Sequence, residues 1–453
     1  MSLVVRSERI VLPEGVRPAT IHIRDGRIVS IGELSDRFAG IREMDVGAHV
    51  VLPGLVDTHV HINDPGRADW EGFGHATRAA AAGGVTTLVD MPLNSVPATT
   101  TAAGLEQKRH AARGRCHVDV GFWGGVVPGN ASDLAPLARA GVLGFKCFMC
   151  PSGVDEFGHV GESDLREALP ILSRLDRPLL VHAESPELLH DARQPVDGAR
   201  QDPRRYRTWL ESRPDVSEQS AIELLVRLAH EYRARVHIVH LASAAALTAI
   251  RAARAGGVAL SVETCPHYLT FAAEEIADGA TAFKCAPPIR SRANRDRLWA
   301  ALVTGDIDFV ATDHSPAPPA LKHLEDGDFV SAWGGVASLQ LGLSIVWTGA
   351  AERGLPLERL ADWLATRPAR LAGLPAKGAI AVGRDADLAI FDPDREWIVD
   401  AKLLHHRHPV TPYDGRRLRG QVLTTILRGE TVFDRGNCAS VPTGTTLHPA
   451  TDL

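Results

Sequence analysis

The chain has 453 residues, of which 45% are hydrophobic and 23% are charged, and its formal net charge at pH 7 is -6. A chain of this length exceeds one small domain and suits a large barrel with an accessory unit. The acidic balance and the lack of a basic block argue against nucleic acid or an anionic membrane as a partner. No apolar run reaches the length that spans a bilayer.

The six cysteines are scattered along the chain without regular spacing. In a chain of this size they predict reduced core residues rather than a disulfide framework. Cys147 and Cys150 form a C-x-x-C pair, but Phe148 and Met149 between them provide no redox or zinc-finger context. The first residues, MSLVVRSERIVLPEG, lack the long apolar core of a signal peptide, so we expect a cytoplasmic protein.

Both ends of the chain have the alternating pattern of short strands. Residues 1–52 contain SLVVRSERIVL and ATIHIRDGRIVSIG, with Asp25 and Gly26 at a hairpin turn. The same pattern returns in GAIAVGRDADLAIFD and in VLTTILRGETVFDRG, where Arg428 and Gly429 mark a second turn. We expect residues 1–52 and 376–453 to form one small β-sandwich domain, with a loose polar tail after Cys438.

Eight short apolar runs in the middle of the chain predict the strands of a parallel barrel. Helical runs such as EQSAIELLVRLAHEYR lie between them, and continuous apolar character indicates strands covered on both faces. We therefore expect an α/β fold with a (β/α)8 TIM barrel over residues 53–375. A doubly wound sheet would also alternate strands and helices, but no glycine-rich phosphate loop opens a helix. The expected strands span residues 55–60, 85–90, 118–123, 142–148, 178–183, 236–241, 259–263 and 308–312.

The first of these strands carries a candidate metal site, within the sequence GLVDTHVHINDPG. Side chains two apart on a strand point to the same face, so His59 and His61 project together from its end. Two imidazoles placed in this way can hold one divalent cation. The alternative is a pair of partly buried histidines that form hydrogen bonds at a strand edge.

The ends of four further strands carry groups that can bind a metal: Lys146, His182, His240 and Asp313. The active sites of such barrels lie at these strand ends. A histidine at the end of a strand is often a hydrogen-bonded core residue, and Asp313 could cap the next segment. These alternatives to a metal site would all have to be true at the same time.

Lys146 lies inside an apolar run, where a buried ammonium is expensive. A neutral buried amine can react with CO2 to form a carbamate, whose two oxygens can bridge two cations. We therefore expect a binuclear metal site at the rim of the barrel.

Several motifs resemble those of the cyclic amidohydrolases of the amidohydrolase superfamily, in the same order and over nearly the whole chain. They are PGLVDTHVHI, GFKCF, LVHAES, VHLAS, ETCPHYL, KCAPPIR and ATDHSP. The resemblance implies a barrel with a small β-unit from both chain ends, a homotetramer, and two divalent metal ions per subunit. The ions would be Zn²⁺, although related enzymes accept Co²⁺, Mn²⁺ or Fe²⁺. The implied ligands are His59, His61, Lys146 (as N6-carboxylysine, which requires CO2) and Asp313 for one ion, and Lys146, His182 and His240 for the other.

Such a ligand set predicts the hydrolysis of a cyclic amide. Two neighbouring cations can hold a bridging water, lower its pKa and polarise a ring carbonyl, so that a hydroxide attacks. Asp313 is the expected catalytic residue, because it can take the proton of the water and pass it to the ring nitrogen. An amide nitrogen leaves poorly unless it is protonated.

Three kinds of relative compete for the substrate: allantoinases, dihydroorotases, and hydantoinases or dihydropyrimidinases. Dihydroorotases typically place an arginine two residues after the His pair, where this chain has Asn63. The segments PGRADWEG, MPLNSVPATT and AWGGVASLQ resemble allantoinases. Hydantoinases tend to have a tyrosine in the loop after the fourth strand, where Phe157 is the only bulky ring here, although that loop is short for an allantoinase. The resemblance therefore implies the conversion of allantoin to allantoate.

Allantoin is an uncharged hydantoin with a ureido arm, so its pocket needs hydrogen-bonding groups more than a cationic clamp. The expected substrate contacts are Asn94, Ser315, and backbone groups at Cys285, Ala286, Gly334 and Gly335. Asn94 could equally set a turn, and Ser315 could cap a helix.

Two further features have competing explanations. The segment HHRHPV contains His405, His406 and His408, but it follows the barrel, so we expect a solvated segment against the β-unit rather than a third metal site. A function of another class is a non-catalytic interaction protein derived from such an enzyme. All six ligand positions keep metal-binding residue types, which favours the enzyme.

Overall fold

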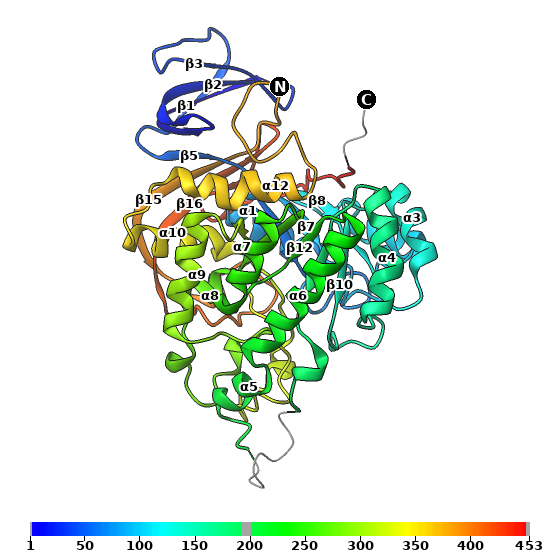
Figure 1. Ribbon diagram of the computed structural model, residues 1–453. Coiled ribbons are helices and arrows are strands. Elements are labelled where there is room, and N and C mark those ends of the chain that lie inside the picture. The colour runs from blue at the N-terminus through cyan, green and yellow to red at the C-terminus, as the bar shows by residue number, and fades with distance from the viewer. Residues whose placement is uncertain (1, 192–200, 450–453) are drawn as a thin grey trace.

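The computed structural model describes residues 2–191 and 201–449. It contains a barrel of parallel strands surrounded by helices, and a β-sheet unit beside one end of the barrel (Figure 1). The expected fold class is thus confirmed. Within the described ranges, no helix is both long enough and apolar enough to cross a membrane.

The β-unit is one nine-stranded sheet in the order β18-β17-β16-β15-β5-β1-β2-β3, with β4 paired to β1. Its strands are β1 (Ser2–Leu12), β2 (Gly15–Arg24), β3 (Arg27–Gly32), β4 (Arg42–Asp45), β5 (Val50–Pro53), β15 (Leu388–Ile398), β16 (Arg417–Leu427), β17 (Glu430–Asp434) and β18 (Asn437–Cys438). Strands β5 and β15 pair antiparallel, with Leu52 opposite Ala389, so the two chain ends meet in one sheet. The boundaries after residues 52 and 375 stay predictions.

Both turns expected in this sheet are present. Asp25 and Gly26 connect β2 to β3 with φ of 49° and 79°, and Arg428 and Gly429 connect β16 to β17 with φ of 46° and 80°. Positive φ at both central residues matches the twist of the flanking strands, and a glycine in the second position adopts it without a steric penalty.

All eight expected barrel strands are present, and each overlaps its expected range. They are β6 (Leu55–Val60), β7 (Val85–Asp90), β8 (Asp119–Phe122) with β9 (Gly124–Gly125), β10 (Phe145–Phe148), β11 (Leu179–His182), β12 (Val236–Ile238), β13 (Leu260–Thr264) and β14 (Phe309–Val310). Parallel pairing runs through β6-β7-β8 and through β9 to β14 in order. A parallel bridge between Val60 and His314 joins the first strand to the last.

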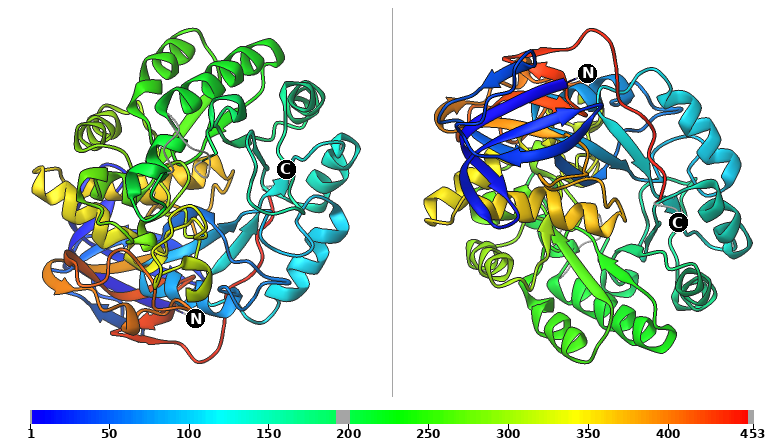
Figure 2. Two further views of the ribbon diagram at one scale, coloured as in Figure 1. Left: turned by 90° about the horizontal axis from the view of Figure 1, so that it is seen from below. Right: turned by 90° about the horizontal axis from the view of Figure 1, so that it is seen from above.

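Helices cover the outside of the barrel, as the two views in Figure 2 show. In α4 the buried residues are Leu165, Ala168, Leu169 and Leu172, a spacing that places them on one helical face. The longer helices are α1 (Phe73–Ala82), α2 (Ala102–Ala112), α3 (Ala131–Ala140), α4 (Glu162–Arg174), α6 (Asp215–Tyr232), α7 (Leu247–Ala255), α9 (Arg292–Thr304) and α10 (Gly342–Glu352). Shorter helices are α5 (Tyr206–Ser212), α8 (Pro266–Thr270), α11 (Glu358–Ala361) and α12 (Arg367–Leu371).

The tail after Cys438 was expected to be loose, and this expectation is wrong for its described part. Thr446 forms a parallel bridge with Val120 of β8, and the amide of Thr445 donates to the Asp119 carboxylate at 2.8 Å. A Cβ on Gly444 would lie 2.0 Å from the Val118 carbonyl oxygen, so the chain passes very close to the barrel here. The tail is ordered because it pairs with the edge of β8 that the three-stranded β6-β7-β8 sheet leaves open (Figure 2, right).

A buried ion cluster joins the barrel to the β-unit. The Lys377 ammonium lies 2.6 Å from Asp119, 2.9 Å from Asp385 and 2.7 Å from Asp387. Burial acts to lower the pKa of Lys377, but the three carboxylates together raise it above its usual value. Removal of this ammonium would leave Asp387 without its ion-pair partner, while Asp119 and Asp385 would keep Arg428 and Arg27, and the loss of a buried partner is destabilising.

Candidate active site

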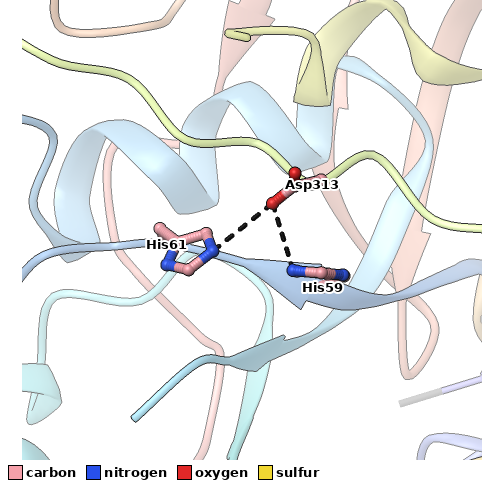
Figure 3. Close-up of side chains that lie close together, drawn as sticks. All are labelled: His59, His61 and Asp313. Atoms are coloured by element: carbon pink, nitrogen blue, oxygen red, sulfur yellow. Dashed lines mark ion pairs between the residues drawn. The ribbon is translucent and has the colours of Figure 1, made fainter. Parts of the chain in front are cut away.

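Three buried side chains meet at the end of β6 and β14 (Figure 3). His59 Nε2 lies 3.1 Å and His61 Nε2 lies 3.4 Å from the same oxygen, Asp313 Oδ1. The two imidazoles reach Asp313 together because they are two residues apart on one strand. Two nitrogens and a carboxylate so close together could hold a metal ion.

A second group of side chains adjoins the first. The rings of His59 and His240 are 5.4 Å apart, and those of His240 and His182 are 4.5 Å apart, measured between centroids. Lys146 on β10 is fully buried, with its ammonium 4.3 Å from the centre of the Phe148 ring. Among the described residues, neither Lys146 Nζ nor His240 Nδ1 has a hydrogen-bond partner. Buried polar atoms without partners are rare in native proteins, so these two atoms fit a group that the protein chain itself does not supply.

Two buried glutamates orient the histidines. His59 Nδ1 bonds to Glu263, and His182 Nε2 lies 2.6 Å from Glu184 Oε2. Each contact uses one ring nitrogen and leaves the other for a ligand. Glu263 also lies 3.1 Å from His237 Nε2, while the guanidinium of Arg213 binds Glu184. We did not expect these glutamates from the sequence, although both lie in motifs quoted above, LVHAES and ETCPHYL.

The electrostatics of the first group favour a charged pair. Burial acts to lower the pKa of His59, but Asp313 and Glu263 raise it to about 9. Burial acts to raise the pKa of Asp313, but His59 and His61 hold it well below its usual range. Burial also lowers the pKa of Lys146 to about 8, which increases the share of neutral amine near neutral pH.

A cavity of about 250 Å³ opens above these residues. Five of the six expected metal ligands line it, namely His59, His61, His182, His240 and Asp313. Lys146 is not among the lining residues. The lining also includes five of the expected substrate contacts: Asn94, Ala286, Ser315, Gly334 and Gly335.

Cys285 is the exception among the expected contacts, because it does not line the cavity. Its carbonyl oxygen instead accepts a hydrogen bond of 2.9 Å from the Trp209 indole. Trp209, Arg213 and Lys284 line the cavity without having been expected there. Their positions depend on how the long loops after the strands fold, which no local pattern records.

Asn63 and Phe157, the two positions that differ from dihydroorotases and hydantoinases, do not line the cavity. The Asn63 amide faces the Pro316 carbonyl oxygen at 3.4 Å, and Phe157 is fully buried against Phe148. Arg67 connects the loops around the cavity, because it pairs with Glu156 and donates to the Asn94 carbonyl oxygen.

The HHRHPV segment matches the expectation of a solvated segment against the β-unit only in part. Arg407 and Pro409 are exposed, and the His405 ring lies 6.1 Å from that of Phe433 in β17. His406 is buried, and its ring lies 4.8 Å from that of His314, which directly follows Asp313. The backbone amide of Arg407 donates to Glu71 at 3.2 Å. The segment thus contacts the barrel, because its imidazole fills space behind the rim rather than facing water.

The family is decided by a match over most of the chain: the model of the Amidohydrolase family covers residues 50–432. The chain belongs to the amidohydrolase family. An allantoinase from Streptomyces avermitilis is 51% identical to this amidohydrolase and covers 96% of each chain. An allantoinase from Arabidopsis thaliana is 47% identical, over 96% of this chain and 89% of its own.

Solved structures agree on the architecture. The L-hydantoinase (dihydropyrimidinase) from Arthrobacter aurescens superimposes on this amidohydrolase with a TM-score of 0.92 and 32% identity, over 98% of this chain and 99% of its own. The dihydropyrimidinase from Brevibacillus agri gives a TM-score of 0.90 with 27% identity, over 99% of each chain. The barrel with its composite β-domain is therefore an arrangement that this amidohydrolase shares with known enzymes.

Proposed function

We propose that this chain hydrolyses the hydantoin ring of allantoin to give allantoate. The identity of 51% to a named allantoinase, over nearly the full length of both chains, carries this proposal. Solved relatives named for hydantoin or dihydropyrimidine are less similar, at 32% and 27%. The cavity offers neutral hydrogen-bonding groups such as Asn94 and Ser315, which suit an uncharged ureide. The two cations in its lining already have partners in the protein: Arg213 pairs with Glu184, and Lys284 donates to backbone carbonyl oxygens.

The proposed site would hold two divalent metal ions, by resemblance Zn²⁺, at the rim of the barrel. Its ligands are His59, His61, Lys146 and Asp313 for one ion and Lys146, His182 and His240 for the other. The Lys146 amine would add to CO2, forming a carbamate and releasing a proton. The partnerless Lys146 Nζ and His240 Nδ1 support this assignment, because a carbamate and a cation would satisfy both.

The residues around the site define the proposed reaction. A bound pair of divalent cations would lower the pKa of a water toward about 7 and polarise the ring carbonyl. Asp313 accepts the proton of the attacking water and delivers it to the ring nitrogen, so that the C–N bond breaks and a carboxylate forms. The contacts of Asp313 with both histidines keep it ionised and therefore able to accept that proton.

The contact between His182 and Glu184 yields a test of the ligand assignment. We expect Glu184→Gln to weaken the affinity of the protein for its metal ions by roughly 10- to 100-fold, because the amide orients the imidazole less strongly than the carboxylate does. Chelator competition with elemental analysis measures this affinity. Glu231→Gln is the matched control, since Glu231 pairs with Arg166 on the surface. An unchanged affinity in Glu184→Gln would contradict the assignment of His182.

The second candidate is a hydantoinase or dihydropyrimidinase, which the structural likeness to such enzymes favours. Dihydroorotase is a weaker candidate, because Asn63 replaces the arginine expected there and lies outside the lining of the cavity. A substrate panel of allantoin, hydantoin, dihydrouracil and dihydroorotate with the metal-loaded protein separates them. Preference for allantoin is expected, and faster hydrolysis of hydantoin or dihydrouracil would replace the proposal with the second candidate.

Two further aspects of the proposal rest on resemblance. A homotetramer is expected, and sedimentation of the purified protein measures the oligomeric state. A non-catalytic interaction protein would show no hydrolysis in the panel at any metal loading. The retained set of histidines, lysine and aspartate argues against that alternative.

A further inference from the structure

One wall of the cavity is a segment without regular structure, the residues 330–335 that follow η5 (Pro319–Lys322). Ala332, Trp333, Gly334 and Gly335 of this segment all line the cavity. The segment lies directly against the end of β14, because the Ser315 amide donates to the Val336 carbonyl oxygen at 3.0 Å. It therefore borders the residues that follow Asp313.

Two buried lysines hold this wall: Lys284, which also lines the cavity, and Lys322, which does not. Lys284 Nζ donates to the carbonyl oxygens of Val330 at 3.0 Å and of Ala332 at 2.5 Å. Lys322 Nζ donates to those of Trp333 at 3.0 Å and of Gly335 at 2.6 Å. The two side chains are 5% and 3% exposed, so water competes little for these four carbonyls.

The peptide N–H groups of the wall are also held. The Trp333 amide donates to the Leu321 carbonyl oxygen at 2.7 Å, and the Gly335 amide donates to that of Lys284 at 2.8 Å. Gly335 has a φ of +126°, and a Cβ there would lie 2.3 Å from the Ser315 carbonyl oxygen, so only glycine fits this close approach.

Gly334 stands apart from its neighbours in the wall. Within the described ranges, neither its N–H nor its C=O forms a hydrogen bond with the protein. A Cβ on it would meet nothing closer than 3.9 Å, so the residue faces open space on the cavity side. Gly334 thus presents an unused donor and acceptor on the cavity side, while the peptide groups of its neighbours Trp333 and Gly335 are held.

We propose that Lys284 and Lys322 are positioning residues, which fix residues 330–335 so that the Gly334 peptide binds the N–H and C=O edge of a cyclic ureide. The identity of the bound ring rests on the proposed function. The holding of residues 330–335 by Lys284 and Lys322, here called the clamp, concerns the protein alone. Both lysines act through the carbonyl oxygens that they hold. Lys284 also lines the cavity, whereas Lys322 does not, so Lys322 is the residue to substitute first. Pre-organised backbone groups bind without an ordering penalty, so loosening of the wall weakens binding more than it slows the chemistry.

The test compares Lys322→Met with Lys377→Met, which removes a buried lysine that is distant from the wall. For Lys322→Met we expect the KM for allantoin to rise about tenfold, with kcat within about threefold of wild type and an unchanged metal content. Allantoin should bind about tenfold more weakly to Asp313→Asn/Lys322→Met than to Asp313→Asn by calorimetry. Lys377→Met should lower the thermal stability while the KM of the folded protein stays at the wild-type value.

Hydrogen exchange provides a readout that does not depend on the substrate. Amides of residues 330–336 should exchange faster in Lys322→Met than in wild type, while those of the barrel strands should not change. Wild-type exchange and KM in Lys322→Met would overturn the inference, as would an equal rise of KM in Lys377→Met. If Lys322→Met does not fold, Lys284→Met is judged by the exchange of residues 330–336, because Lys284 itself lines the cavity and its KM would not separate the two roles.

The experiments distinguish an error in the proposed function from an error in the proposed role of the two lysines. A wild-type protein inactive on allantoin would remove the proposed function, while exchange of residues 330–336 would still decide on the clamp. An active wild type with unchanged exchange in both lysine variants would remove the clamp alone.

Discussion

Asp313→Asn is expected to retain its metal ions and to lose roughly 10² to 10⁴-fold in kcat. The amide keeps an oxygen near His59 and His61, but it cannot accept the proton of the attacking water. Steady-state hydrolysis of allantoin, with metal content measured on the same sample, checks both parts of this expectation.

The matched control for this variant is Asp57→Asn. Asp57 is a buried aspartate on the same strand as His59, but its oxygens face Thr312 and backbone amides rather than the cavity. This control should affect stability more than kcat. Wild-type turnover in Asp313→Asn would end the assignment of Asp313 as the proton-transferring residue.

Lys146→Ala is expected to lose bound metal and to lower activity at least about 100-fold. A residue that merely orients a ligand contributes 10- to 100-fold, and a bridging ligand should contribute no less. The substitution also removes the amine that is proposed to form the carbamate. Elemental analysis of the purified variant, followed by activity with added metal, measures the two effects.

Added short carboxylic acids should restore part of the activity of Lys146→Ala, because a carboxylate can occupy the space of the lost side chain and bridge the cations. The same acids should not rescue Asp313→Asn, whose missing function is proton transfer. Normal metal content in Lys146→Ala would count against the bridging role of this lysine.

The barrel and the histidine cluster could be predicted from the sequence because their signals are local. A strand buried on both faces is continuously apolar, and the His-x-His pair projects from one face by the period of the strand. His59, His61 and Asp313 therefore lie close together, as their positions at the ends of strands predicted. Lys146 attracted attention for a related reason, since an amine within an apolar run demands an explanation.

The parts that could not be predicted depend on contacts between distant segments. Glu263 bonds His59 across 204 residues, and Lys322 holds carbonyls of a segment without a helical or strand pattern. The tail was expected to be loose because its sequence is polar, but its pairing with β8 uses backbone groups that every sequence has.

The path of the tail determines how the chain can be handled experimentally. The β-unit is not a detachable module, since the chain leaves it after β18 and pairs through Thr446 with β8 of the barrel. Deletion from Gly444 onward would uncover the open edge of that strand and remove a partner of Asp119.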